Sequence, residues 1–342
     1  MTTRWFGERV QRAEDDRLLR GKGRFTDDID DGALESVLVR SPYAHARIRS
    51  IEVGAARMLP GVFAVYTAKD LPFGETDLPI LIPHPNLTHG RTQRCLASEV
   101  VRYAGEAVAF VVAESRAIAE DAAELVDVDY EPLPVVITPE AAARADHLVH
   151  DDVPGNVAAE MVQEKGNVAA ALESAPRRKR FHFRYERGAA SPMEARAVWA
   201  RWSDDERKLT VYDSTQSPTS IRGGLAVLFG LPESQVEVIA PDVGGGFGPK
   251  IMLFYPDELL VPYAAMQLGR PVKWTEDRQE HFTAVNQERG QVHEVDVGYD
   301  DEGRVLALDD DFIHDGGADD HGPRPSPALR HCGQDLLAGR AR

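Results

Sequence analysis

The sequence predicts a mixed α+β fold, in which strand and helix segments alternate without a regular period. Three observations support this prediction: one continuous apolar run, several runs with helical spacing, and two pairs of strand-like segments that flank polar turns. The chain has 342 residues, which at roughly 150 residues per domain indicates about two domains. It contains no internal repeats.

The clearest pattern near the N-terminus is a predicted β-α-β unit. Residues 107–113 (AVAFVVA) form a continuous apolar run that is typical of a buried strand. Apolar residues within 118–126 share one helical face, and residues 126–130 then alternate between apolar and acidic side chains, as in a strand. Pro132 and Pro134 end the unit.

Residues 138–160 combine prolines, a glycine and several acids around an alanine-rich piece, which is typical of an inter-domain linker. We therefore place a boundary near residue 145, which gives a first domain of residues 1–145 and a second of residues 146–318. From Asp319 the apolar periodicity is lost, and residues 319–342 are predicted to be a disordered tail.

The second domain starts with a predicted hairpin of residues 198–199 and 209–212 around a polar turn. Ser217 is a good N-cap for a helix with Pro218 at its first position, and Gly230 ends that helix. The remaining predicted elements are a strand at 236–239, a glycine loop at 244–248, a helix at 257–268 and a hairpin of 292–299 with 305–308.

Composition and charge exclude several classes of protein. The formal net charge is −17, and an acidic surface repels phosphate backbones, so we expect no nucleic-acid partner. The basic stretch 176–184, which is interleaved with aromatic residues, could bind nucleic acid, but we favour a solvated strand in an acidic protein or one that faces an acidic partner.

The sequence predicts a cytoplasmic protein without membrane insertion. Its N-terminus has no apolar segment of a signal peptide, and no apolar run reaches the length of a membrane span. The two cysteines, Cys95 and Cys332, exclude a disulfide framework and a zinc spacing. We interpret Cys95 as a buried apolar residue rather than a nucleophile.

The glycine loop Gly244–Gly248 could expose backbone amides to a ligand. A dinucleotide fingerprint would need glycine where Pro249 stands, and a Walker loop would need Ser or Thr after Lys250, where Ile251 stands. Glycine count alone therefore favours a tight turn at the exit of a strand.

Two other candidates lie outside the loop. Gln216, just before the capped helix, could donate a hydrogen bond to a bound group, although taken alone it is typical of a surface or capping residue. Glu194 and Arg196 are two residues apart on a predicted strand, so we expect an ion pair between them.

Together these motifs resemble the large subunits of molybdenum hydroxylases, the xanthine dehydrogenase/aldehyde oxidase family. Their order and spacing agree over about residues 4 to 318. The resemblance implies an a/b hammerhead domain, followed by an incomplete first molybdopterin-binding domain. The hammerhead motifs are at 21–29, 39–48, 60–62, 101–109 and 128–134, and those of the molybdopterin domain are at 192–196, 214–218 and 241–250.

The resemblance also implies roles for individual residues. Gln216 stands where the family's glutamine hydrogen-bonds an oxo ligand of molybdenum, and the backbone around Phe247 stands where the family contacts the metal and its pterin dithiolene. We therefore expect Gln216 and Phe247 at the metal, and Gln216, Gly245, Gly246, Phe247 and Gly248 around the cofactor, in its cytosine dinucleotide form. Amide donors suit its anionic oxo and thiolate ligands.

One departure bears on the substrate. Purine-oxidising members carry a glutamate shortly after the loop lysine, and here Ile251, Met252 and Leu253 follow Lys250. The sequence is thus closer to the branch that resembles carbon monoxide dehydrogenase. Aldehydes, N-heterocycles and carbon monoxide all stay open as substrates.

A second departure is length, because family large subunits extend far beyond residue 342. The resemblance places the catalytic general-base glutamate beyond this chain, so no catalytic residue is assigned to it. We expect a frameshift or premature stop near residue 318 and a chain that is inactive alone. The resemblance implies two partner subunits, one with 2Fe-2S clusters and one with FAD, and a dimer of such heterotrimers. The activity that it implies is oxidative hydroxylation of a substrate, with water as the source of oxygen. The alternative is a non-catalytic fragment that keeps the fold but binds no cofactor.

Overall fold

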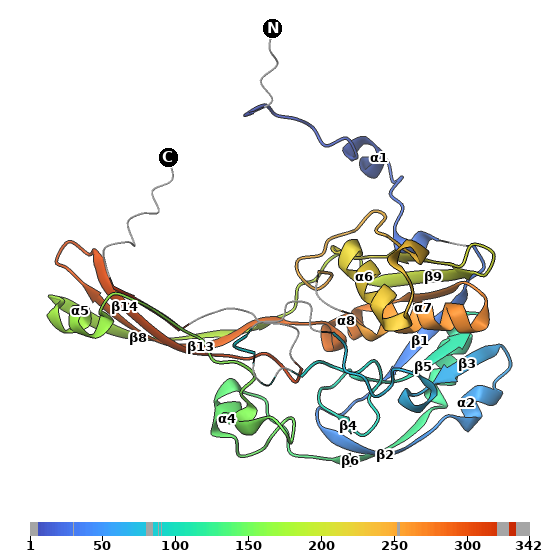
Figure 1. The fold of residues 1–342 in the computed structure, drawn as a ribbon, viewed down its shortest axis with the longest axis horizontal. Helices are drawn as coiled ribbons and strands as arrows, with labels where there is room; N and C mark the ends of the chain where they lie inside the picture. The colour runs from blue at the N-terminus through green and yellow to red at the C-terminus, as the bar shows by residue number, and fades with distance from the viewer. Residues whose placement is uncertain are drawn as a thin grey trace, which may run out of the picture.

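The computed structural model describes residues 6–29, 31–79, 85–87, 89, 91–251 and 254–319, and the backbone of 328–332. Three sheets organise these residues (Figure 1). The largest has seven strands in the order β11-β10-β9-β12-β1-β5-β3. Their bounds are β1 Leu34–Arg40, β3 Val62–Tyr66, β5 Ala107–Ala113, β9 Ala197–Ser203, β10 Lys208–Asp213, β11 Val236–Ile239 and β12 Val272–Thr275.

Helices cover both faces of this sheet, because its strands are apolar on both sides. Along β5, Phe110 and Val112 pack in one cluster with α6 and α7, whereas Val111 and Ala113 pack in another with α2 and α3. The mixed α/β class that the sequence predicts is confirmed. The helices are α2 Gly54–Met58, α3 Arg116–Glu124, α6 Pro218–Phe229 and α7 Pro256–Leu268.

The seven-stranded sheet is built from both predicted domains. β1 pairs in parallel with β12, in a register that sets Leu34 beside Val272. It also pairs antiparallel with β5. The segments before and after residue 145 therefore share one hydrophobic core.

The predicted β-α-β unit needs one correction. Its strand, helix and strand exist as β5, α3 and β6 (Asp127–Pro132), and the Ser115 hydroxyl accepts a hydrogen bond from Ile118 N at the start of α3. However, β6 pairs with β2 (Ala46–Glu52) in a separate three-stranded sheet that β4 (Val100–Val101) completes. The unit therefore spans two sheets, because the half-polar β6 fits a partly solvated sheet better than the buried one.

The third sheet forms a long ribbon that extends away from the body, with α5 beside it (Figure 1). Its order is β7-β15-β14-β13-β8, and it contains the second predicted hairpin as β13 and β14. The bounds are β7 Val162–Lys165, β8 Arg177–Gly188, β13 Glu288–Tyr299, β14 Val305–His314, β15 Ala328–Cys332 and α5 Val168–Ser174.

The basic stretch 176–184 lies mainly in β8, which is a mostly exposed strand at the edge of this sheet. This agrees with the prediction of a solvated strand. Its charges meet acids of the neighbouring strand: Arg178 Nε and Arg180 Nε lie 2.8 and 2.9 Å from Asp296. These arginines lower the pKa of the Asp296 carboxyl.

Strand β15 lies within the segment that the sequence predicts to be a disordered tail. Its backbone pairs antiparallel with β14 and in parallel with β7. Residues 320–327 and 333–342 of that segment lie outside the described residues.

The other elements connect these sheets. Residues 138–160, the predicted linker, contain α4 and a short 3-10 turn. Cys95 is fully buried, as predicted, and burial raises the pKa of its thiol. The remaining helices are α1 Asp15–Leu19, α4 Pro139–Arg144 and α8 Arg278–Ala284, with 3-10 turns at Thr26–Asp28, Ala68–Asp70, Pro154–Asn156 and Glu233–Gln235.

Candidate functional site

Strand pairing brings the glycine loop and Gln216 together. β10 and β11 are parallel neighbours, so the segments that follow them leave the sheet at the same edge. Gln216 follows β10, directly before the helix α6, and the loop 244–248 follows β11. The helix begins at Pro218 and ends at Gly230 in the left-handed conformation, as predicted. The Ser217 side chain does not cap it, however, because its hydroxyl donates to Ser220 Oγ over 2.8 Å and accepts no backbone N–H of the helix.

Gln216 and the glycine loop touch at two points. Gly248 N donates to Gln216 Oε1 over 3.1 Å. A Cβ atom on Gly246 would lie 2.3 Å from Gln216 Cδ, so any larger residue there would displace the Gln216 side chain. Because Gln216 Oε1 accepts this bond, the NH₂ group is the end of the side chain that can donate to a bound group.

The loop has an unusual backbone. Gly245, Phe247 and Gly248 have φ of 102, 53 and 106°. Phe247 is the costly member, because left-handed φ disfavours a residue with a side chain. Its side chain is 70% exposed, and a Cβ on Gly248 would meet nothing within 4 Å. The predicted site residues therefore form one continuous, open surface.

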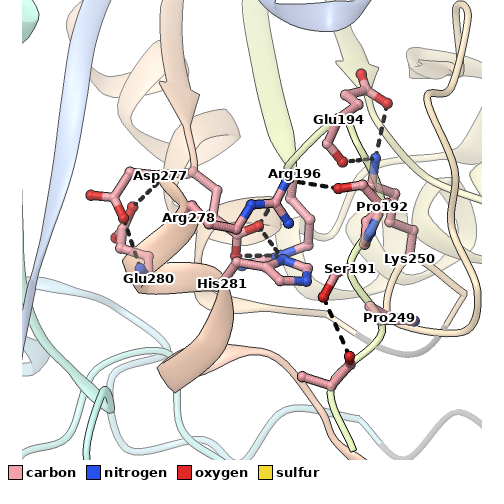
Figure 2. A network of polar contacts seen from close by, with 12 residues as sticks. Ser191, Pro192, Glu194, Arg196, Pro249, Lys250, Asp277, Arg278, Glu280 and His281 are labelled. Carbon is pink, nitrogen blue, oxygen red and sulfur yellow. Dashed lines mark hydrogen bonds and ion pairs between the residues drawn. The ribbon is translucent and has the colours of Figure 1, made fainter.

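Glu194 contacts the glycine loop, because its carboxylate accepts a hydrogen bond from Gly244 N. Its ion-pair partner is not the residue that the sequence predicts. Its carboxylate lies 2.9 Å from Lys250 Nζ, whereas Arg196 binds other acids, so the expected ion pair between Glu194 and Arg196 is wrong (Figure 2). The physical reason is local: residues 191–196 form an irregular segment before β9, so alternation along a strand does not apply to them.

Arg196 is the centre of a buried charge network. It is 3% exposed, donates to both oxygens of Asp257 at 3.0 Å and to Glu276 Oε1 at 3.2 Å, and its guanidinium lies 3.7 Å from the centre of the Tyr255 ring. Burial disfavours the charged guanidinium, but Asp257 and Glu276 outweigh this and raise the pKa of Arg196. The network fixes β9, β12 and α7 to one another.

Further ties hold the segment that precedes β9. Arg278 of α8 donates to the Pro192 carbonyl over 2.7 Å, and His281 Nε2 donates to the Ala190 carbonyl over 2.7 Å (Figure 2). The other ring nitrogen of His281 lies 2.8 Å from Glu276. Burial opposes ionisation of Glu276, but its bonds to Arg196 and His281 prevail and lower its pKa to about 2.

Acids outnumber bases in this buried region. Asp213, at the end of β10, is 2% exposed, and burial together with nearby Asp257 raises its pKa to about 8. Burial and Asp213 likewise raise the pKa of Glu258 well above its usual value. These acids therefore keep protons at neutral pH. Sequence analysis missed them, because Asp257 and Glu258 at the start of a predicted helix look like ordinary solvated first-turn acids.

Hydrogen bonds hold the N-terminal segment around Arg17 and Arg24 next to the glycine loop. Both oxygens of Asp242, two residues before Gly244, accept hydrogen bonds from Arg17, and one of them also accepts from Arg24 N over 2.7 Å. The Arg17 guanidinium lowers the pKa of Asp242 to about 2.

Comparison with known proteins defines the class. Residues 149–334 match the molybdopterin cofactor-binding domain, and residues 20–134 match the aldehyde oxidase and xanthine dehydrogenase a/b hammerhead domain. The chain belongs to the xanthine dehydrogenase/aldehyde oxidase family of molybdenum-binding large subunits and is similar to carbon monoxide dehydrogenase. The predicted family is thereby confirmed.

Three relatives show how similar the chain is to individual proteins of this family. The chain is 39% identical over 321 residues to the nicotine 6-hydroxylase large subunit of Paenarthrobacter nicotinovorans, covering 93% of this chain and 39% of that protein. It is 36% identical to the carbon monoxide dehydrogenase large chain of Afipia carboxidovorans, covering 94% and 40%. The crystal structure of quinoline 2-oxidoreductase from Pseudomonas putida 86 matches with a TM-score of 0.82 and 41% identity, covering 88% and 38%. The chain thus spans about two fifths of these relatives' length.

The described residues fit the group that this family binds. Gln216 has an amide NH₂ to donate, and a Cβ on Gly248 would meet nothing within 4 Å, so a ligand that accepts hydrogen bonds has room there. Ile251, which follows the loop lysine, is 42% exposed, and Met252 and Leu253 lie outside the described residues. Within the described part of the chain, no helix has the length and apolar character that crossing a membrane requires.

Proposed function

We propose that this chain is the molybdenum-cofactor-binding part of an oxidoreductase that hydroxylates its substrate with water as the oxygen source. The observation that carries the proposal is the contact between Gln216 and the Gly246–Gly248 turn. The side-chain oxygen Oε1 of Gln216 accepts a hydrogen bond from Gly248 N, so the side-chain NH₂ group can donate to a bound group. When bound, the cofactor supplies the two-electron redox chemistry of its metal.

The chain's own residues would bind and orient this group. Backbone amides of Gly245, Gly246 and Phe247 would face its anionic atoms. Gly248, whose amide donates to Gln216 Oε1, would leave room for the group, and Gln216 would donate to a ligand of the metal. We propose the cytosine dinucleotide form of molybdopterin. The exposed Phe247 ring would shield one side of the group from water.

Substrate and partners are part of the same proposal. Nicotine, quinoline and carbon monoxide appear in the names of relatives, and another solved relative is an aldehyde oxidoreductase, which supports an N-heterocycle, an aldehyde or carbon monoxide as the substrate. Several relatives are named as large chains or complex subunits, which supports partner subunits for this chain. We propose that one partner carries 2Fe-2S clusters and another FAD, and that two such heterotrimers form a dimer. We place the assembly in the cytoplasm.

One experiment separates this proposal from the alternative, a non-catalytic chain that keeps the fold. The chain is produced in cells that make molybdopterin cytosine dinucleotide, and the purified protein is analysed for molybdenum by mass spectrometry and for pterin by fluorescence. The proposal expects both in wild type and a loss of at least tenfold in Gly246→Ala. Gly223→Ala, with open space at its Cβ position, is the matched control. A wild-type protein without either signal supports the non-catalytic alternative.

A further inference from the structure

One carboxylate oxygen joins the three segments that build the candidate cofactor site. Glu194 Oε2 accepts from Gly244 N at 2.6 Å, from Ser214 Oγ at 2.9 Å and from Lys250 Nζ at 2.9 Å. Ser214 lies two residues before Gln216, and Gly244 and Lys250 flank the glycine turn. Each donor therefore comes from a segment that carries, or directly adjoins, a proposed cofactor-binding residue.

Lys250 extends this connection to Gln216. Its ammonium group is buried and also donates to the Glu194 carbonyl at 3.0 Å, and its own carbonyl accepts from Gln216 N at 2.7 Å and from Thr215 Oγ1 at 3.1 Å. The backbone of Gln216 is thus tied to Glu194 through one intervening residue.

The packing leaves little room for adjustment. A Cβ atom on Gly244 would lie 2.5 Å from Glu194 Cβ, so the loop backbone rests directly on the glutamate side chain. Because the donors converge on one oxygen, a change in the position of that oxygen must move the loop, the Gln216 turn, or both.

We propose that Glu194 is the positioning residue that sets the distance between Gln216 and the Gly246–Gly248 turn. It acts through Ser214, Gly244 and Lys250, and it is not itself a cofactor ligand. This inference rests on the proposed function for its biological meaning, but its geometric content can be tested in the free protein.

The discriminating probe is the amide of Gly248. Its hydrogen bond goes to Gln216 Oε1 and not to Glu194. If Glu194 served only as the counter-ion of buried Lys250, a variant that keeps the charge would leave this amide unchanged. If Glu194 sets the position of the loop, the same variant must lower the protection of Gly248.

Glu194→Asp is that variant, because it keeps the carboxylate but withdraws it by one carbon–carbon bond, about 1.5 Å. The matched control is Glu186→Asp on the exposed strand β8. Hydrogen exchange is followed by mass spectrometry or NMR at residues 242–250, with β13 as the internal reference. The inference expects exchange at Gly244 and Gly248 at least tenfold faster in Glu194→Asp, unchanged exchange in β13, and a wild-type profile for Glu186→Asp.

Ser214→Ala provides a milder test if Glu194→Asp does not fold, because it removes one donor and leaves both charges in place. It should speed exchange at Gly248 several-fold. Unchanged Gly248 exchange in a folded Glu194→Asp or Ser214→Ala protein overturns the inference. Faster exchange everywhere in the chain, β13 included, also overturns it, because it reveals a general loss of stability instead of positioning.

The cofactor measurement keeps the two proposals distinct. If wild type acquires molybdenum and Glu194→Asp acquires it equally, the positioning role fails while the proposed function stands. If wild type acquires none, the proposed function fails, and the exchange data still decide whether Glu194 positions the loop.

Discussion

Replacing Asp213 with Asn should make the protein more stable, and increasingly so as the pH rises. The Asp213 carboxyl is 2% exposed, and its Oδ2 atom has no hydrogen-bond partner among the described residues. Burial and the nearby Asp257 raise its pKa from 3.8 to about 8. Asn resembles the protonated acid in shape and cannot ionise.

The sign follows from the proton balance. Between pH 4 and 8 the folded protein holds a proton on Asp213 that the unfolded chain releases. Stability is therefore lost as the pH rises through this interval. At about 1.4 kcal/mol per pKa unit, the penalty is roughly 2 kcal/mol at pH 5 and roughly 5 kcal/mol at pH 8. These figures are upper limits, because neighbouring side chains and water can relax around an ionised Asp213.

The assay is urea unfolding of wild type and Asp213→Asn at pH 5, 6.5 and 8. The difference in free energy of unfolding should favour the variant and should grow by about 2–4 kcal/mol across this range. Asp205→Asn, in an exposed turn, is the control and should show no trend. A less stable Asp213→Asn at pH 8 would refute the reasoning, because it would mean that an ionised Asp213 stabilises Arg196 and Lys250.

Three further predictions concern packing and the charged contacts. A Cβ on Gly224 would meet the Phe254 ring at 2.1 Å, so Gly224→Ala should destabilise the chain by a few kcal/mol. Gly223→Ala in the same helix has open space at its Cβ and should stabilise the chain by about 0.5–1 kcal/mol. Equal midpoints of thermal unfolding for the two variants would contradict this prediction. Arg196→Met leaves Asp257 and Glu276 without their buried partner and should cost about 3–5 kcal/mol in urea unfolding, and a cost below about 1 kcal/mol would argue against a buried network. Asp242→Ala removes the acceptor of Arg17, so trypsin should cut the N-terminal segment several-fold faster, and an unchanged cleavage rate would show that other contacts hold it.

Local signals in the sequence were enough for most single elements. Pro218 at the first helical position, the glycine stop at Gly230 and the polar turns of both hairpins lie in short stretches whose conformation their own residues determine. Gln216 and the glycine loop were each recognised from their own motif, but their contact depends on the parallel pairing of β10 with β11, which no local pattern shows.

What sequence analysis missed depends on contacts between distant segments. The partner of Glu194 is Lys250, 56 positions later, and the partners of Arg196 come from α7 and from the end of β12. Two charges at i and i+2 in a motif give no sign of this, because burial decides which opposite charge each one finds. The assignment of β5 and β6 to different sheets is likewise invisible in a pattern that shows only strand, helix and strand.

The parallel pairing of β1 with β12 has a consequence for synthesis. Leu34 leaves the ribosome 238 residues before its neighbour Val272. Until residues 272–275 emerge, one side of β1 is an open strand edge beside the finished pairing with β5. Such a nascent chain can pair with another chain at that edge, so slow translation or a stop before residue 272 should favour aggregation. The same pairing that joins the two segments in one core thus makes early folding depend on a strand made late.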